Sequence, residues 1–298
     1  MTRTSATPVH RLELVGVGSV VVDRIARTPR IIGPEEKISL MPGAGGLYLE
    51  HVGGVTLNHL AWASLMGASV GLAGRAATDK EATVVREGMR RHGITPHLIE
   101  DGSATAVSLI FVDPQGERAI YMSRGTNGET DAAHLRHHHG DWLRAAKYVS
   151  TEISQVPLDG VVEVLEQARA GGAITVLDLD IPKADALASL GTPAQFDRAL
   201  ALADILKPAK GALQGLGITA DDALGYAAAL RDRFGSAAVV VTDGARGCAL
   251  ASESFSGRLP AFPAGLVLDT TGAGDAFLGG LLAARIQGLA WEQAARVA

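Results

Sequence analysis

Short apolar runs alternate with helical patterns along most of this chain, and few folds accommodate that order. The apolar runs read as strands at residues 12–22, 69–73, 147–150, 174–179, 204–206 and 238–242. Helical spacing lies between them, at residues 55–66, 80–92, 158–170, 193–203 and 220–234. Strands that alternate with helices pair in parallel, and a parallel sheet needs helices on both faces. The sequence therefore predicts a three-layer α/β fold with a mostly parallel central sheet.

Two stretches break this alternation. Residues 27–52 are rich in Gly and Pro and have no helical period. Residues 106–122 read as a β-hairpin, because two strand-like runs flank a turn at residues 113–116, Asp-Pro-Gln-Gly. We expect these excursions to pair into a small lid sheet, with segments at about 24–52 and 104–123, over a site at the strand ends. Residues 1–298 would then form a single domain with this lid.

Composition excludes several classes of protein. The formal net charge of −5 lacks the basic excess of a nucleic-acid binder. The apolar runs are short and interrupted by Gly or charge, so none predicts a membrane span. Cys248 is the only cysteine and has no partner for an internal disulfide, and the N-terminus shows no signal-peptide pattern. We therefore expect a cytoplasmic protein.

The most informative local motif is DTTGAGD at residues 269–275, which precedes a helical pattern. Gly272, Ala273 and Gly274 would present backbone N–H groups at a helix N-terminus, where unsatisfied donors and the helix dipole favour an anion. A carboxylate at Asp275 can accept the proton of a substrate hydroxyl while those amides hold the charge of a transferring phosphoryl group. The alternative is a Gly-rich loop before an ordinary helix-terminal Asp. The length of the motif and its late position favour phosphoryl transfer.

The longer string DTTGAGDAF resembles the C-terminal signature of the ribokinase-like (PfkB) carbohydrate kinase family. Three other segments resemble family motifs in the same order: GGVTLN at 53–58, SVGLAGRAATD at 69–79 and VVTDGARG at 240–247. The likeness covers residues 12 to about 289. It implies a ribokinase-like fold with a small β lid. It also implies an ATP-dependent transfer of the γ-phosphoryl group to a hydroxyl of a sugar or sugar acid.

The resemblance implies roles around the acceptor. Asp275 would be the general base beside the anion hole. Sugar hydroxyls would be bound by a group in which glycines allow close backbone approach and an amide offers both a donor and an acceptor, namely Asp23, Gly53, Gly54 and Asn58. Glu152 matches a position near the sugar or metal. Arg124, at the end of the hairpin, is either a partner for the carboxylate or phosphate of an acidic sugar or a surface arginine.

The resemblance also implies cofactors. Thr242, Gly244 and Gly247 would line the ATP phosphates or adenosine. Asp269 and Thr271 resemble positions that hold a monovalent cation, often K⁺, in many members. We expect Mg²⁺ as well, because ATP chemistry without a divalent ion leaves the phosphate charge poorly compensated.

Three departures from the family pattern bear on these expectations. The family often carries Asn-x-x-Glu where this chain has LKPAKGA, at residues 206–212. Lys207 is then a candidate for direct contact with ATP phosphates, whereas Lys210 fits a solvated lysine better. Ala77 and Ala82 stand where glycines are common. The chain ends at Ala298, where members usually continue, so we expect that a C-terminal segment is absent from this sequence.

Several alternatives stay open at this point. The missing Asn and Glu favour a non-catalytic nucleotide- or sugar-binding regulatory protein on the same fold, and the intact GAGD disfavours it. A nucleoside kinase is disfavoured by the aromatic content of 4%, because a nucleoside pocket needs stacking partners. The acceptor sugar stays open. A homodimer that pairs through the lid strands is a further expectation.

One histidine run invites a metal-site reading. Residues 137–139 are all His. Adjacent residues on a helix do not face one point, so the run predicts a solvated helix end rather than a metal cluster.

Overall fold

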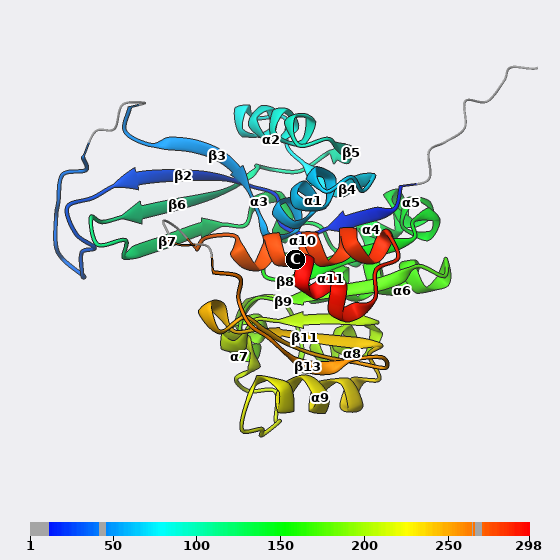
Figure 1. The fold of residues 1–298 in the computed structure, drawn as a ribbon. Coiled ribbons are helices and arrows are strands. Elements are labelled where there is room, and N and C mark those ends of the chain that lie inside the picture. The colour runs from blue at the N-terminus through cyan, green and yellow to red at the C-terminus, as the bar shows by residue number, and fades with distance from the viewer. Residues whose placement is uncertain (1–11, 42–45, 264, 266–269) are drawn as a thin grey trace, which may run out of the picture.

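The computed structural model describes residues 12–41, 46–263, 265 and 270–298, and a large sheet forms its centre (Figure 1). Within these residues the sheet has nine strands in the order β13, β12, β11, β10, β9, β8, β1, β4 and β5. All neighbours from β11 to β5 pair in parallel, whereas β12 and β13 are antiparallel. The bounds are β1 Leu14–Val17, β4 Val70–Ala76, β5 Ile94–Glu100, β8 Tyr148–Ile153, β9 Ile174–Leu179, β10 Ile205–Pro208, β11 Ala238–Thr242, β12 Cys248–Ser252 and β13 Ser256–Leu259. The predicted mostly parallel sheet is confirmed.

Successive side chains of the central strands enter different cores. In β9, Val176 packs into one hydrophobic cluster and Leu177 into another. Ile205 and Leu206 of β10 divide in the same way. Because strand side chains alternate between faces, both faces of the sheet need apolar cover, and the strands read as continuous apolar runs.

Helices supply this cover on both faces. One face packs against α1 Val55–Leu65, α2 Lys80–Arg91, α10 Ala273–Ile286 and α11 Trp291–Val297. The opposite face packs against α4 Ala132–His138, α5 Gly140–Ala145, α6 Leu158–Ala170, α7 Lys183–Ser189, α8 Pro193–Leu202 and α9 Ala223–Phe234. The short α3 spans Gly125–Gly128. This arrangement is the expected three-layer fold, and none of the described helices has the length and apolarity needed to cross a bilayer.

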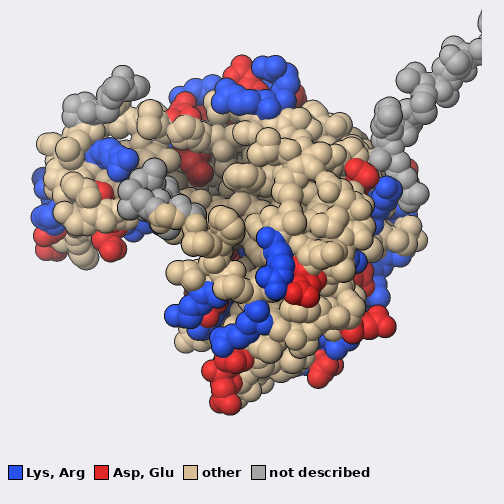
Figure 2. Space-filling view, in the orientation of Figure 1, with Lys and Arg blue, Asp and Glu red and all other residues tan. Residues whose placement is uncertain are grey.

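A second sheet projects from the main body (Figures 1 and 2). It contains β2 Val21–Arg27, β3 Leu49–Gly53, β6 Ala106–Val112 and β7 Arg118–Ser123, in the order β3, β2, β6, β7. β6 and β7 form the predicted hairpin, which the Asp113 N–H closes by donating to the Glu117 carbonyl at 3.0 Å. β2 pairs in parallel with β6 along its whole length. The two excursions therefore belong to one sheet, in which β2 lies between β3 and the hairpin.

The predicted first strand, residues 12–22, is wrong as a single element. The structure divides it into β1 and β2, which belong to different sheets. The chain leaves the large sheet at Gly18 and Ser19, where the Ser19 hydroxyl accepts a hydrogen bond from the Val55 N–H at 2.9 Å. Apolar periodicity does not reveal this break, because the residues on both sides of it are buried.

The sequence pattern missed several peripheral elements. β5, β12, β13 and the short helices α5, α7 and α11 were not predicted, and of α4 only its end at the histidine run was expected. β5 contains Pro96, which argues against a central strand. The structure places β5 at the edge of the sheet, where proline is tolerated.

Gly16 in β1 provides a test of the packing between α1 and the sheet. A Cβ at this position would lie 2.6 Å from Thr56 Cγ2 and 2.7 Å from Leu60 Cδ1, and both side chains are fully buried. We expect Gly16→Ala to lower the free energy of unfolding by about 1–3 kcal/mol, the usual cost of overpacking. Urea denaturation of both proteins measures the difference.

Gly211→Ala is the matched control, because a Cβ at Gly211 meets nothing within 4 Å. Its free energy of unfolding should stay within about 0.5 kcal/mol of the parent value. An equally small effect of Gly16→Ala would contradict the close approach of α1 to β1.

Candidate active site

Helix α10 begins directly behind a glycine in the left-handed region. Gly272 is the N-cap with a φ of 74°, which glycine adopts without strain. The first-turn amides of an α-helix have no partner within the helix and can bind an anion. The start of α10 therefore coincides with the three residues expected to form the anion hole. Of the three residues, Ala273 already donates its N–H to the Thr270 carbonyl at 3.2 Å.

Asp275 lies in the first turn of α10 and is 8% exposed. Asn58 of α1 donates a hydrogen bond from Nδ2 to Asp275 Oδ2 at 2.8 Å. Burial raises the pKa of Asp275 to about 7; Asp178 and Glu152 add to the rise, and Asn58 and Lys207 oppose it. The carboxylate therefore changes its protonation near neutral pH. Asn58, expected to bind substrate, contacts the expected base instead.

Three neighbouring strands end in a row of buried ionisable side chains. Glu152 of β8 pairs with Asp178 of β9, and Asp178 pairs with Lys207 of β10. Val176 and Ile205, two residues earlier on β9 and β10, belong to the cluster beneath α1 and α10. Because side chains two residues apart share a face, the charged row faces the same helices.

Lys207 and Asp178 form an ion pair inside this row. Lys207 Nζ donates to the two carboxylate oxygens of Asp178 at 2.9 and 2.8 Å. Burial pulls the pKa of Lys207 down, but the charges of Asp178, Asp180 and Asp275 outweigh it and raise that pKa. A Cβ on Gly274 would lie 3.2 Å from Nζ, so the ammonium lies beneath the first turn of α10. Lys207 is thus a buried cation below the anion hole rather than an exposed lysine.

Asp178 was missed by the sequence reasoning. Its side chain is fully buried, and burial raises its pKa to about 6, with Lys207 opposing and Asp180 adding to the rise. The available signal was the segment VLDLD, in which an apolar strand ends in two carboxylates at positions 178 and 180. Two acidic residues at the end of a parallel strand indicate a site on that edge of the sheet.

Glu152 is held by the first turn of α1. The backbone N–H and the hydroxyl of Thr56 donate to Glu152 Oε2 at 2.7 and 2.6 Å. A Cβ at Gly18 would lie 1.9 Å from Thr56 Oγ1, so only glycine leaves room for this contact. Burial raises the pKa of Glu152 to about 7. Its Oε1 atom is buried without a hydrogen-bond partner among the described residues.

Three expected sugar-binding residues lie together where the two sheets meet. A Cβ on Gly53 would lie 2.2 Å from Asp23 Oδ2, so the Asp23 carboxylate lies against the glycine backbone. Gly54 is the N-cap of α1 with a φ of 112°. Burial raises the pKa of Asp23, against a lowering by the Ser108 hydrogen bond and His51. These groups form a polar corner beside the start of α1.

The expected nucleotide-binding residues lie one strand away from Lys207. Thr242 ends β11, and a bridge joins it to Ala209 just after β10. Gly244 and Gly247 have φ values of 54° and 85°, which fit the tight turn between β11 and β12. The structure therefore places this turn at the same edge of the sheet as the end of β10.

Lys210 is an exposed lysine, as expected. Its Nζ donates to Asp243 Oδ2 at 3.1 Å. Arg246 also binds Asp243, at 2.9 and 2.7 Å, and these contacts, Arg246 foremost, lower the pKa of Asp243 to about 2. The turn thus carries two cations around one carboxylate.

Arg124 and Thr271, two residues expected in the site, have hydrogen-bond partners outside the groups described above. Arg124 donates from Nη1 to the Ser189 carbonyl at 2.9 Å, toward the end of α7. The Thr271 hydroxyl accepts a hydrogen bond from Arg118 at the start of β7. Asp269 lies outside the described residues.

The chain is similar to sugar kinases in sequence. The bifunctional ribokinase/ribose-5-phosphate isomerase A of Fructilactobacillus sanfranciscensis is 26% identical over 276 residues, which cover 90% of this chain and 48% of that protein. This chain therefore spans about half the length of that relative. A fructokinase of Klebsiella pneumoniae is 29% identical over 259 residues, covering 83% of this chain and 80% of that protein.

Solved structures share the fold. Arabidopsis thaliana ribokinase complexed with ribose and ATP has a TM-score of 0.78 and 22% identity, covering 96% of this chain and 89% of that chain. A putative ribokinase II from E. coli in complex with ATP and Mg²⁺ has a TM-score of 0.77 and 19% identity, covering 95% and 89%. These likenesses show that the fold is ribokinase-like.

A third comparison, with patterns of protein families, identifies the family of this chain. The pattern of the pfkB family carbohydrate kinases matches residues 11–298 of this chain. That span contains both sheets and all the elements that position Asp275. The chain belongs to the pfkB family of carbohydrate kinases.

Proposed function

We propose that this protein transfers the γ-phosphoryl group of ATP to a hydroxyl of a sugar or sugar acid, with Asp275 as the general base. The observation that carries the proposal is the placement of Asp275. Its buried carboxylate lies in the first turn of α10, with Asn58 on Oδ2 and a pKa raised to about 7 by burial. A general base works best when its pKa lies near the operating pH.

The proposed step uses these groups in sequence. The acceptor hydroxyl loses its proton to Asp275 as its oxygen bonds to the γ-phosphorus of ATP. The bond from that phosphorus to the bridging oxygen breaks, and ADP leaves with the electron pair. First-turn amides of α10 hold the charge on the transferring phosphoryl oxygens, and Lys207 beneath them adds positive potential.

The described residues fit a divalent cation such as Mg²⁺. Hard cations prefer oxygen ligands, and Mg²⁺ keeps several waters while it binds one or two carboxylates. Glu152 has a buried Oε1 without a partner, and Asp178 and Asp180 lie on the next strand and just beyond it. These carboxylates would hold Mg²⁺, and the bound ion would neutralise charge on the ATP phosphates. ATP itself would lie along the turn that contains Thr242, with its phosphates toward α10.

The described residues give less support for a K⁺ site than for a Mg²⁺ site. Of the two residues expected to hold it, Asp269 lies outside the described residues, and Thr271 accepts a hydrogen bond from the cationic Arg118. We derive no step through a monovalent cation.

The acceptor would bind between the polar corner of Asp23, Gly53 and Gly54 and the carboxylate of Asp275. The relatives named ribokinase and fructokinase support a pentose or ketose as the first candidates. The second sheet would act as the lid over this acceptor. Asp23 pairs with Ser108, and Ser108 with Met122, so one face of the sheet carries all three residues. On that face Met122 Sδ accepts a hydrogen bond from Gln155 of the main body at 3.6 Å.

Asp275→Asn tests the proposed chemistry. We expect ATP- and Mg²⁺-dependent phosphorylation in a panel of ribose, fructose, sugar acids and nucleosides, and a loss of about 10²–10⁴-fold in kcat for the variant. Stability should not fall. The raised pKa of Asp275 means that its buried charge destabilises the native state above the ordinary carboxyl pKa, and Asn removes that charge.

Asp141→Asn is the matched control, because Asp141 is a fully exposed acid in the first turn of α5. It should retain full activity. Full activity of Asp275→Asn would remove Asp275 from the mechanism. Nucleotide binding without turnover of any acceptor would favour a regulatory protein on the same fold.

The pH dependence of kcat/KM tests how the charges around Asp275 set the pKa of this residue. Asp275 acts when deprotonated, so kcat/KM should fall as the pH drops below an apparent pKa of about 7. Lys207 lowers the pKa of Asp275. We therefore expect Lys207→Met to move this acid limb to higher pH, as measured in pH-rate profiles.

The double variant Asp178→Asn/Lys207→Met is the control for this shift. It removes one charge that raises the pKa of Asp275 and one that lowers it, so its acid limb should lie closer to that of the parent. It also avoids leaving Asp178 buried and unpaired. If the acid limb of Lys207→Met lies at the same pH as that of the parent, Lys207 does not lower the pKa of Asp275.

We also propose a homodimer through the lid. Leu109 and Tyr121 pair across β6 and β7, and they are 42% and 64% exposed. Because side chains alternate along a strand, this pair lies on the opposite face of the sheet from Met122. A second copy would cover this apolar face.

Leu109→Lys should shift the protein from dimer to monomer in light scattering after gel filtration. Leu65→Lys, at a 75% exposed position on α1, should leave the mass unchanged. A monomeric parent protein would overturn this part of the proposal.

A further inference from the structure

A cluster of histidines lies on the face of the large sheet opposite the active site. Leu135 of α4 and Leu143 of α5 pack on the face away from α1 and α10. The cluster contains His134 and His138 of α4, the adjoining His139, and His97 of β5. The prediction of a solvated helix end is wrong for His139, which is fully buried.

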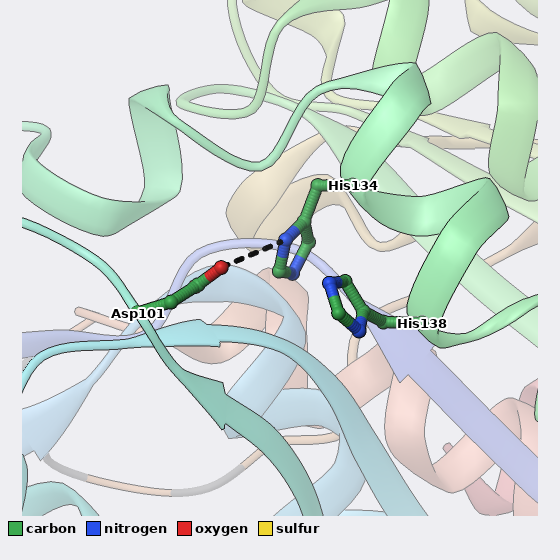
Figure 3. A group of neighbouring side chains, drawn as sticks. All are labelled: Asp101, His134 and His138. Carbon is green, nitrogen blue, oxygen red and sulfur yellow. Dashed lines mark ion pairs between the residues drawn. The ribbon is translucent and has the colours of Figure 1, made fainter.

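Three side chains of this region converge on one point (Figure 3). Asp101, His134 and His138 each offer a ligand atom, and these atoms lie within 4.8 Å of one another. His134 and His138 are four residues apart on α4, and this spacing brings helical side chains together, whereas adjacent positions diverge. Asp101 follows β5 and reaches the pair from the other side.

One nitrogen in this group lacks a hydrogen-bond partner. The His134 side chain is 2% exposed, and its buried Nδ1 has no partner among the described residues. Asp101 Oδ2 lies 3.8 Å from this nitrogen, which is beyond hydrogen-bond distance. A buried polar atom without a partner is costly, so its retention favours a ligand at this point.

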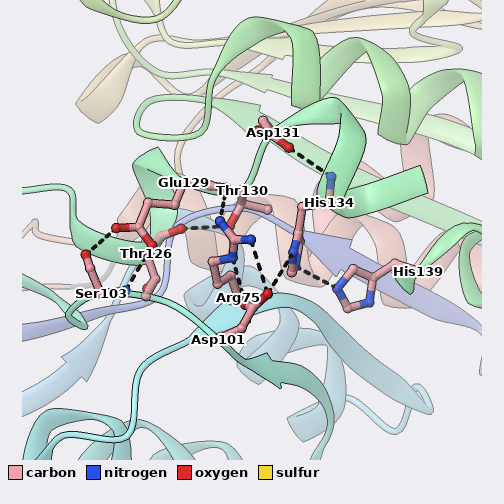
Figure 4. A network of polar contacts seen from close by, with 9 residues as sticks. All are labelled: Arg75, Asp101, Ser103, Thr126, Glu129, Thr130, Asp131, His134 and His139. Atoms are coloured by element: carbon pink, nitrogen blue, oxygen red, sulfur yellow. Dashed lines mark hydrogen bonds and ion pairs between the residues drawn. The ribbon is translucent and has the colours of Figure 1, made fainter. Parts of the chain in front are cut away.

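The other nitrogen of His134 faces a second ring, His139 (Figure 4), which in turn contacts a third ring, His97. His134 Nε2 lies 3.3 Å from His139 Nε2, and His139 Nδ1 lies 2.8 Å from His97 Nδ1. If each ring donates to the next, His134 carries its proton on Nε2 and leaves a lone pair on Nδ1. Metal-binding histidines have this arrangement, in which the second nitrogen is hydrogen-bonded and fixes the tautomer and ring orientation.

Arg75 is the cation beside this group. It donates to both oxygens of Asp101, at 2.8 and 3.2 Å. A metal would share Asp101 with Arg75, whose charge sets a limit on the affinity.

We propose that Asp101, His134 and His138 bind a divalent transition-metal ion of the zinc class. Two imidazoles and one carboxylate suit Zn²⁺ rather than Mg²⁺, and three protein ligands leave a fourth position for water. A tetrahedral site with bonds of about 2 Å needs ligand atoms about 3.3 Å apart. Asp101 is exposed and His138 half-buried, so both can move inward to close the site.

The site would join α4 to the base of the second sheet. Asp101 lies in the connection that leads from β5 into β6. Arg75 also donates to the Glu129 carbonyl at 2.8 Å, and Glu129 follows the return from β7. The metal would therefore fasten the connection from β5 into β6 to the main body, and its role is structural.

Metal binding to the full chain tests the site. After treatment with a chelator and gel filtration, equilibrium dialysis against Zn²⁺ should give one bound equivalent, and Co²⁺ should produce the visible absorption of a tetrahedral N/O site. His138→Ala should reduce both to background. His137→Ala and His92→Ala change exposed histidines outside the group and should bind like the parent.

Thermal unfolding provides a second measurement. Zn²⁺ should raise the melting temperature of the parent and of His137→Ala by mass action, and leave that of His138→Ala unchanged. Circular dichroism of the metal-free variants checks that His138→Ala folds. Equal metal binding by the parent and a folded His138→Ala would overturn the proposal, as would a parent protein that binds no Zn²⁺ above background.

Discussion

The rest of the site depends on the ionisable side chains that are buried where β8, β9 and β10 end. Glu152 and Asp178 have no exposed surface, and Asp275 has little. An isolated buried charge costs several kcal/mol, so such groups need partners or take up a proton. Lys207 and the N-terminus of α10 are the positive groups beside these carboxylates. Because this compensation is incomplete, burial keeps the pKa values of Glu152 and Asp275 near 7.

The fold brings these groups together through register and close packing. Parallel pairing of β8, β9 and β10 puts one ionisable side chain of each strand in line. Helix α1 then supplies Thr56 to Glu152 and Asn58 to Asp275, so one helix orients two of the carboxylates. It reaches the sheet closely because glycines line β1 and its end. The hydrogen bonds from α1 to the carboxylates therefore depend on glycines that take no part in the chemistry themselves.

Much of this architecture could be predicted from the sequence, and the limits have physical causes. The hairpin, the parallel sheet and the start of α10 follow from local patterns. The division of residues 12–22 into two strands does not, because both halves are apolar and only tertiary pairing separates them. The contact between Asn58 and Asp275 joins residues 217 positions apart, which no local pattern reveals. Asp178 was missed because the pairing that places it between Glu152 and Lys207 joins strands that are far apart in the sequence.

The segment after β10 explains why the row of carboxylates matters in this chain. The resembled family often has Asn-x-x-Glu there, and residues 206–212 of this chain contain neither Asn nor Glu. Ala212 is 1% exposed and packs into the core on the face away from α10, with Ala209 packed against the same cluster. A carboxylate at position 212 would place a charge in that core. In our proposal the carboxylates near Mg²⁺ would therefore include Glu152 of β8 and Asp178 of β9, which face α10.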